Sequence, residues 1–197
     1  MESKEITKEL AFSYDELVAY LLDKYGPCEY DYFLKPNCKS RNKKVGRSNE
    51  GLVCHHIDED KAIMLNNPIY AKNNPFDYQR ASRIVYCNIL EHLILHVKIV
   101  EEPRHPLANL LELPGVGGVV KYLCPQINDY YNGYNFKRQH EKNIMKIIAN
   151  NFDDYIGVLK YLLKVTKGKA IYADKVTPER LSEGFDHQIV EKVYKEL

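Results

Sequence analysis

The sequence predicts a predominantly helical α+β fold: one β-hairpin, a long helix after it, and additional helices. Three observations lead to this prediction. Two short runs with strand-forming residues, 51–57 and 62–65, flank an acidic turn. The segment from Phe76 to Glu101 contains no Gly or Pro, which favours one long helix. Apolar residues at helical spacing then recur through most of the second half of the chain.

The composition is that of an ordinary globular protein. The chain has 197 residues, of which 45% are hydrophobic and 28% charged, so it is long enough to bury a core. We expect three segments that pack as one domain. They are an N-terminal helix with a basic loop (1–50), a hairpin and helix that form the core (51–102), and a helical C-terminal region (103–197).

Cysteine usage and hydropathy bear on the compartment. The five cysteines are an odd number, scattered and without a C-x-x-C pair, so we expect reduced, structural thiols. No apolar run approaches the roughly 18 residues that span a bilayer, and the charged N-terminal residues do not resemble a secretory signal. We therefore expect a cytoplasmic protein that does not enter a membrane.

The N-terminal helix has a clear start signal. Ser13 and Glu16 form a capping-box pattern, and apolar residues follow at helical spacing from Leu17. Gly26 and Pro27 predict its end.

The long helix and those after it are marked in the same way. Asn74 and Pro75 are typical of a helix start, and Pro103 and Pro106 predict the end. Thr177 and Pro178 give another start signal. We expect the remaining helices at residues 119–131, 137–150, 152–167 and 187–197.

Four histidines stand out by their spacing. His92 and His96 are four residues apart, so on a helix both imidazoles can approach one metal ion. His55 and His56 are neighbours on the first predicted strand, where adjacent side chains face opposite sides. The two strand histidines therefore have two separate roles.

These residues give the sequence a resemblance to a known superfamily. The stretches Cys54-His55-His56-Ile57-Asp58 and Asn88 to His96, which contains Glu-His-x-x-x-His, resemble the HNH, or ββα-metal, endonucleases. The closest pattern is that of the phage-type homing endonucleases. The resemblance covers roughly residues 50–100, and the flanks carry none.

The resemblance implies a role for each histidine. His55, His92 and His96 would bind a divalent metal ion, and His56 would be the general base that deprotonates the attacking water. Mg²⁺ or Mn²⁺ would support activity, and Zn²⁺ also suits three imidazoles. Three protein ligands leave coordination positions for phosphate and water, as catalysis requires.

The sequence departs from the phage-type pattern at one position. An asparagine that orients the base is expected about nine residues before the first helix histidine, where this chain has Arg83. Asn66, Asn67 and Asn88 are alternatives. We favour Asn88 because it lies on the same helical stripe as His92 and His96, although an N–H donor to nearby backbone or a plain surface position is an equal alternative.

Three acidic residues, Asp58, Asp60 and Glu91, lie close to the histidines in the sequence. Glu91 precedes His92 and so points about 100° around the helix, where its carboxylate can orient an imidazole such as that of His56. Asp58 and Asp60 are interpreted as turn residues rather than ligands.

Local charge indicates where nucleic acid binds. The formal net charge is only +1, but the loop from Lys35 to Arg47 contains no acid and leads into the first strand. Its cations would neutralise phosphates without reading sequence. The predicted nucleic-acid contacts are Lys39, Arg41, Lys43, Lys44 and Arg47 in this loop, and Arg83.

The function predicted from the sequence is metal-dependent cleavage of DNA, with RNA as an alternative substrate. A homodimer would make double-strand cleavage easier. A second hypothesis is a nucleic-acid-binding module with a structural zinc site and no cleavage. A third, another class of metallohydrolase, is weakened because Glu91 precedes His92, so there is no H-E-x-x-H motif.

Overall fold

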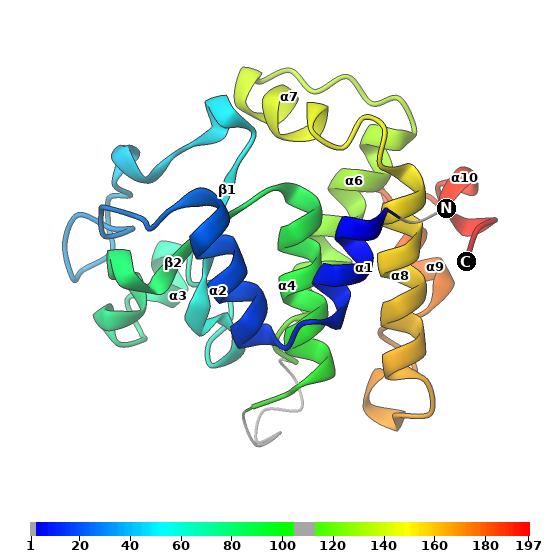
Figure 1. Ribbon diagram of the computed structural model, residues 1–197, viewed down its shortest axis with the longest axis horizontal. Coiled ribbons are helices and arrows are strands. Elements are labelled where there is room, and N and C mark those ends of the chain that lie inside the picture. Colours follow the sequence, from blue (N-terminus) through cyan, green and yellow to red (C-terminus); the bar gives the residue numbers. More distant parts are fainter. Residues whose placement is uncertain (1–2, 105–112) are drawn as a thin grey trace.

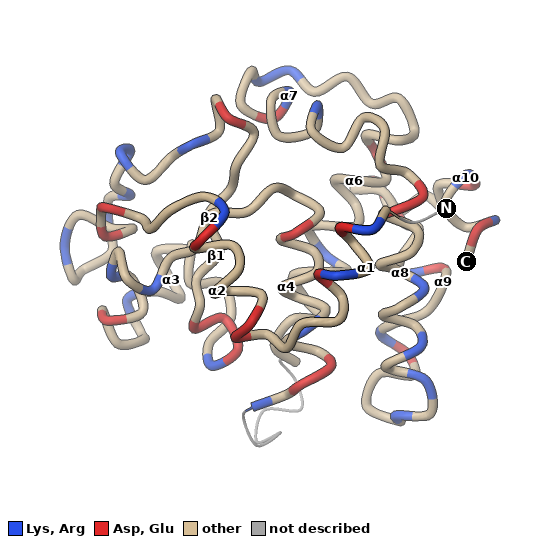
Figure 2. Tube along the Cα trace, viewed as in Figure 1, with Lys and Arg blue, Asp and Glu red and all other residues tan. Residues whose placement is uncertain are grey.

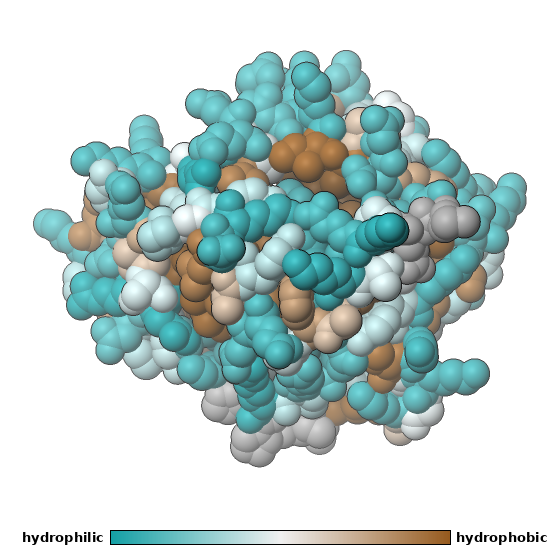
Figure 3. All heavy atoms as spheres, viewed as in Figure 1, coloured by the Kyte–Doolittle hydropathy of each residue, from teal (hydrophilic) through white to brown (hydrophobic). Residues whose placement is uncertain are grey.

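The computed structural model describes residues 3–104 and 113–197. The fold is α+β, with a two-stranded antiparallel sheet and many helices around it (Figure 1). The sheet lies beside one central helix, α4, and this pair positions the histidines. A mostly hydrophilic surface with small apolar areas covers the face seen in Figure 3. Within the described residues, no helix is long and apolar enough to cross a membrane.

Two helices form the N-terminal region, α1 (Lys4–Ala11) and α2 (Tyr14–Tyr25). The predicted capping box of α2 is confirmed: the Ser13 side chain accepts from the Glu16 amide, and the Glu16 carboxylate accepts from the Ser13 amide. Gly26 follows with φ of 76°, a left-handed conformation that glycine adopts without strain, and ends the helix as predicted.

The sheet pairs strands that are distant in the sequence. β1 (Val53–His56) lies where predicted, but its partner β2 is Ile84–Cys87, with His55 opposite Val85. The prediction of a second strand at 62–65 was therefore wrong. All four residues of β2 are buried, and a β-branched and aromatic run of this kind fits a strand covered on both faces.

A long connection of short helical turns joins the two strands. Its elements are η3 (Ile57–Asp60), α3 (Pro68–Ala71), η4 (Phe76–Gln79) and η5 (Ala81–Arg83). Two further 3₁₀ turns, η1 (Lys43–Val45) and η2 (Ser48–Glu50), lie in the loop before β1. Residues 76–83, expected as the first part of a long helix, thus form two 3₁₀ turns. The long-helix prediction was wrong over that part.

The central helix α4 spans Ile89–Glu101. It begins at Asn88, whose side-chain oxygen accepts from the amides of Leu90 and Glu91 and caps the helix. Its end before Pro103 agrees with the prediction, whereas Pro106 lies outside the described residues. Most residues of α4 are buried on every side because α2 and α8 flank it (Figure 1).

The second half contains helices of unequal length. Their bounds are α5 (Val116–Gly118), the π-helical turn η6 (Val119–Leu123), α6 (Cys124–Tyr131), α7 (Gln139–Lys146), α8 (Phe152–Thr166), η7 (Ala170–Tyr172), α9 (Pro178–Ser182) and α10 (Glu191–Tyr194). The helix at 152–167 and the start at Thr177 are confirmed. The last helix is much shorter than the predicted 187–197, and 119–131 begins with a π turn before Pro125.

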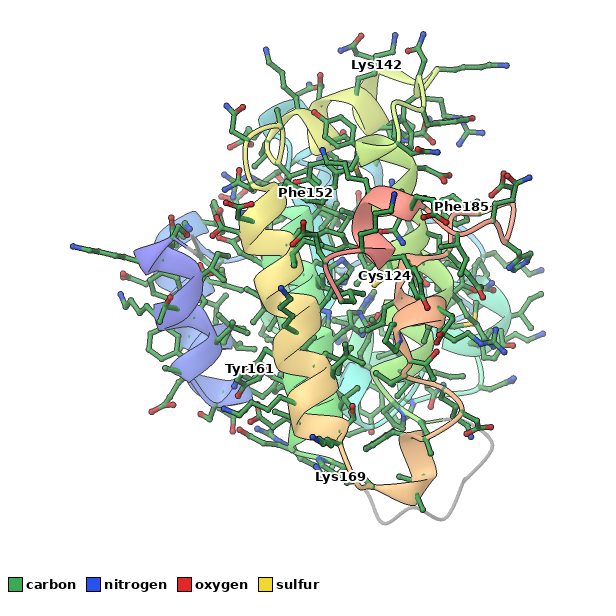
Figure 4. The ribbon with its side chains drawn as sticks, turned by 90° about the vertical axis from the view of Figure 1, so that its right-hand side faces the viewer. Cys124, Lys142, Phe152, Tyr161, Lys169 and Phe185 are labelled. Carbon is green, nitrogen blue, oxygen red and sulfur yellow. The ribbon has the colours of Figure 1, made fainter. Side chains whose placement is uncertain are left out.

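Two apolar clusters hold these elements together. The larger surrounds α4 and includes α8, which lies in front of α4 in Figure 4, with Phe152 at its first turn and Tyr161 further along it. The smaller includes Tyr32, Phe33, Val45 and Tyr86 and packs the loop before β1 against the sheet. β1 lies between the two clusters, so its two faces have different surroundings.

Candidate metal centre

The two histidines of β1 point in opposite directions, as strand geometry predicts. The ring of His55 lies toward α4, with its centroid 5.2 Å from that of His92 and 5.1 Å from that of His96. The rings of His92 and His96 are 4.9 Å apart. His56 faces the other side, where its ring contacts Tyr32 at 4.5 Å.

A carboxylate completes the group of histidines that faces α4. His55, Glu59, His92 and His96 each offer a donor atom, and these atoms all lie within 4.8 Å of one another. Glu59 Oε2 is 3.2 Å from His96 Nε2 and 3.6 Å from His55 Nδ1. We call these four residues the metal centre, since together they can hold a metal ion.

The sequence interpretation missed Glu59 because it assigned residues 58–61 to a simple turn between strands. In the structure this segment begins with the 3₁₀ turn η3, which carries Glu59 back toward the strand it follows. The sequence feature that could have identified Glu59 is its position four residues after His55, because residues at this spacing can contact each other when the chain between them is helical.

The donor atoms fit a small divalent ion. Nδ1 of His55 and Nε2 of His92 are buried and have no hydrogen-bond partner among the described residues, although buried polar atoms are normally paired. A tetrahedral ion with bonds of about 2.0–2.1 Å holds its ligand atoms about 3.3–3.4 Å apart. The 3.2 and 3.6 Å separations from Glu59 Oε2 lie on either side of that spacing.

The protonation states suit metal binding. Burial lowers the pKa of His92 to about 3 and that of His55 well below its ordinary value, so both imidazoles are neutral near pH 7. The centre therefore contains two imidazoles, those of His55 and His92, that can donate a nitrogen lone pair to a metal ion near pH 7.

His56 is held by a glutamine. The Gln79 amide nitrogen donates to the Leu65 carbonyl at 3.1 Å, which leaves Gln79 Oε1 to accept from His56 Nε2 at 3.0 Å. His56 thus carries its hydrogen on Nε2, and its Nδ1 lies 3.6 Å from Glu59 Oε1. Gln79 is fully buried, and its two hydrogen bonds fix the orientation of the His56 ring.

The two other residues proposed for catalysis are directed elsewhere. Asn88 uses its side-chain oxygen to cap α4. The Glu91 carboxylate accepts from the Asn88 amide at 2.6 Å, from Lys24 at 2.7 Å and from Tyr25 at 3.0 Å. Glu91 does point away from the ligand stripe, as expected, but the acid beside His56 is Glu59.

Two of the predicted nucleic-acid contacts are engaged within the protein. Arg83 donates twice to Asp58, at 2.6 Å each, and Arg47 donates to Glu50 and to the Tyr25 carbonyl. Asp58, which also pairs with Lys61, is accordingly held in the turn.

The other four predicted nucleic-acid contacts, Lys39, Arg41, Lys43 and Lys44, are exposed. Figure 2 shows Lys and Arg along the segment between α2 and β1. Arg41 lies over the Tyr32 ring at 4.7 Å, and Tyr32 in turn contacts His56. The loop is therefore linked to His56 through Tyr32, on the face of β1 that is turned away from His92 and His96.

No protein-family model, curated protein or solved structure matches the chain. The chemistry of the centre therefore follows from its own donor atoms and their surroundings.

Proposed function

We propose that the protein is a metal-dependent endonuclease that hydrolyses phosphodiester bonds in DNA. The observation that carries this proposal is the convergence of His55 from β1 with His92 and His96 from α4. An antiparallel strand pair followed at once by a helix, with ligands on the first strand and the helix, is the arrangement that the HNH resemblance leads us to expect.

The three histidines would bind the ion through imidazole nitrogens, which add no negative charge and so would leave the charge of the ion available to the substrate. A bound divalent ion would neutralise the charge that develops on the scissile phosphate. Imidazole donors favour Zn²⁺ over Mg²⁺, while Mg²⁺ or Mn²⁺ would serve if the phosphate and water supply oxygen ligands.

His56 is proposed to accept a proton from the attacking water through Nδ1. Gln79 supports this role because it keeps the hydrogen of the ring on Nε2 and leaves the Nδ1 lone pair on the side of Glu59. A fixed ring orientation is what a general base needs, and such catalysis contributes about 10²- to 10⁴-fold in rate.

The substrate is proposed to approach over the exposed lysines and Arg41 of the basic loop. These side chains would bind the phosphate backbone irrespective of sequence, with an affinity that falls as salt rises. Arg83 and Arg47 would contribute by fixing the turn and the loop, since both are paired with acids. A homodimer would allow both strands to be cut.

A second function is favoured by one specific observation. Glu59 supplies a fourth protein donor, and His56 is only 1% exposed. Four protein ligands are typical of a structural zinc site, which needs no base. In that case the protein would recognise nucleic acid without cutting it.

A plasmid digest distinguishes the two functions. The protein is incubated with supercoiled DNA and Mg²⁺, Mn²⁺ or Zn²⁺, and metal content is measured by plasma mass spectrometry. The nuclease predicts cleavage by the wild type, loss of cleavage with retained metal in His56→Ala, and loss of both in His92→Ala. His140→Ala, an exposed histidine on α7, is the matched control.

Unimpaired cleavage by His56→Ala would refute the general-base role. Absence of cleavage under all three metals, with one tightly bound zinc per chain, would favour the structural function.

A further inference from the structure

The phenol of Tyr14 joins the N-terminal helix α2 to the metal centre. Its hydroxyl is 2.8 Å from His55 Nε2 and 2.9 Å from the backbone oxygen of Ile57. Tyr14 is 1% exposed, and the Arg104 guanidinium lies over its ring at 5.1 Å. The hydroxyl is thus held between a histidine ligand and the backbone that follows β1.

The hydrogens available determine which group donates in each of the two contacts of the Tyr14 hydroxyl. The Tyr14 hydroxyl has one hydrogen, and the Ile57 carbonyl can only accept it. The contact with His55 is then satisfied only if His55 Nε2 carries a hydrogen and donates it to the tyrosine oxygen. A neutral imidazole with its hydrogen on Nε2 has its lone pair on Nδ1.

That lone pair is on the atom that the metal centre needs. Nδ1 of His55 faces Glu59 Oε2 at 3.6 Å and is among the buried nitrogens without a hydrogen-bond partner in the described part of the chain. The opposite tautomer would put a hydrogen on Nδ1 and block it as a ligand. Hydrogen bonds from the second ring nitrogen commonly fix metal-binding histidines in this way.

We infer that Tyr14 is a positioning residue that selects the Nδ1 lone pair of His55 for the metal ion. The inference rests on the metal centre of the proposed function but does not require that the protein cuts DNA. It assigns α2, which lies outside the segment that resembles the HNH nucleases, a part in the centre.

The test compares Tyr14→Phe with Tyr172→Phe. Tyr172 is also a buried tyrosine that donates to a backbone carbonyl, that of Val100 at 3.2 Å, but it contacts no histidine of the centre. Zinc affinity is measured by competition with a chelator. The tautomer of His55 is read in the metal-free proteins from long-range ¹H–¹⁵N spectra, with His55→Gln used to assign its signals.

In the wild type we expect the His55 hydrogen on Nε2. Tyr14→Phe should give a mixture with the Nδ1–H form and zinc affinity about 10- to 100-fold weaker, the range typical of such outer partners. Tyr172→Phe should keep both the tautomer and the affinity.

Three results would overturn the inference: an Nδ1–H tautomer in the wild type, unchanged zinc affinity in Tyr14→Phe, or weaker affinity with an unchanged tautomer. The tautomer of His55 is measured on the wild type alone, so this test remains decisive even if Tyr14→Phe does not fold. Failure to cleave DNA would refute the proposed nuclease while leaving these measurements intact.

Discussion

Glu59 Oε2 lies 3.2 Å from His96 Nε2, across the gap between the turn after β1 and the helix α4. This contact brings a carboxylate into a group of three imidazoles. If Glu59 binds the ion, the centre has four protein ligands, as structural zinc sites do; if it does not, one coordination position is left for a substrate or water.

Replacing Glu59 separates its contribution from that of the histidines. We expect Glu59→Ala to weaken zinc affinity by about tenfold or more, because one charged donor is lost. Cleavage at saturating metal should persist, since three histidines still hold the ion. Zinc competition and plasmid digestion check both results, and loss of cleavage at full metal occupancy would assign Glu59 a direct part in the reaction.

The metal-free protein should lose stability as pH falls. The folded-state pKa values of His92, about 3, and of His55 lie below the value of about 6.5 in the unfolded chain. Between these limits the unfolded chain binds more protons, so the free energy of unfolding decreases as pH falls below about 6.5. Each such histidine contributes about 1.4 kcal/mol per pH unit.

Urea unfolding of the metal-free protein from pH 7 to pH 4 measures this slope. His92→Gln should reduce it, because this variant lacks one titrating group. A free energy of unfolding that stays level across the range would contradict the buried, neutral state of the two histidines.

Gln79→Leu tests how His56 is oriented. The variant removes the acceptor for His56 Nε2 and the donor to the Leu65 carbonyl, so we expect about 1–3 kcal/mol lower stability. Cleavage should fall by about tenfold or more with metal content unchanged. Gln79→Glu, which keeps an acceptor for His56, should retain more activity than Gln79→Leu, and equal losses would remove the orienting role.

Neighbouring glycines of α5 offer a matched pair of variants. A Cβ on Gly118 would come within 2.5 Å of Nδ1 of His96, whereas a Cβ on Gly117 would meet open space. We expect Gly118→Ala to displace the His96 ring and weaken zinc affinity by about tenfold, with little effect from Gly117→Ala. Equal affinities of the two variants would show that His96 is not confined from this side.

The histidine pattern could be predicted from sequence because each part depends on local periodicity. Alternation along β1 separates His55 from His56, and the spacing of four on α4 places His92 beside His96. The start of α4 was not predicted, although Asn88 and Glu91 form a capping box there.

The remaining features depend on contacts between distant segments. Residues 84–87 form a strand only because they pair with β1, and a run without Gly or Pro does not distinguish that outcome from a helix. Gln79 reaches His56 through a 3₁₀ turn in the long connection between the strands. Tyr14 reaches His55 from a helix about forty residues earlier, which no local spacing can indicate.

The most direct test of the metal centre is X-ray absorption of the protein loaded with one equivalent of Zn²⁺. The centre predicts three imidazole nitrogens and one oxygen at about 2.0–2.1 Å, with the imidazole signal reduced by one in His92→Ala. Sulfur ligands at about 2.3 Å, or fewer than three imidazoles in the wild type, would contradict it.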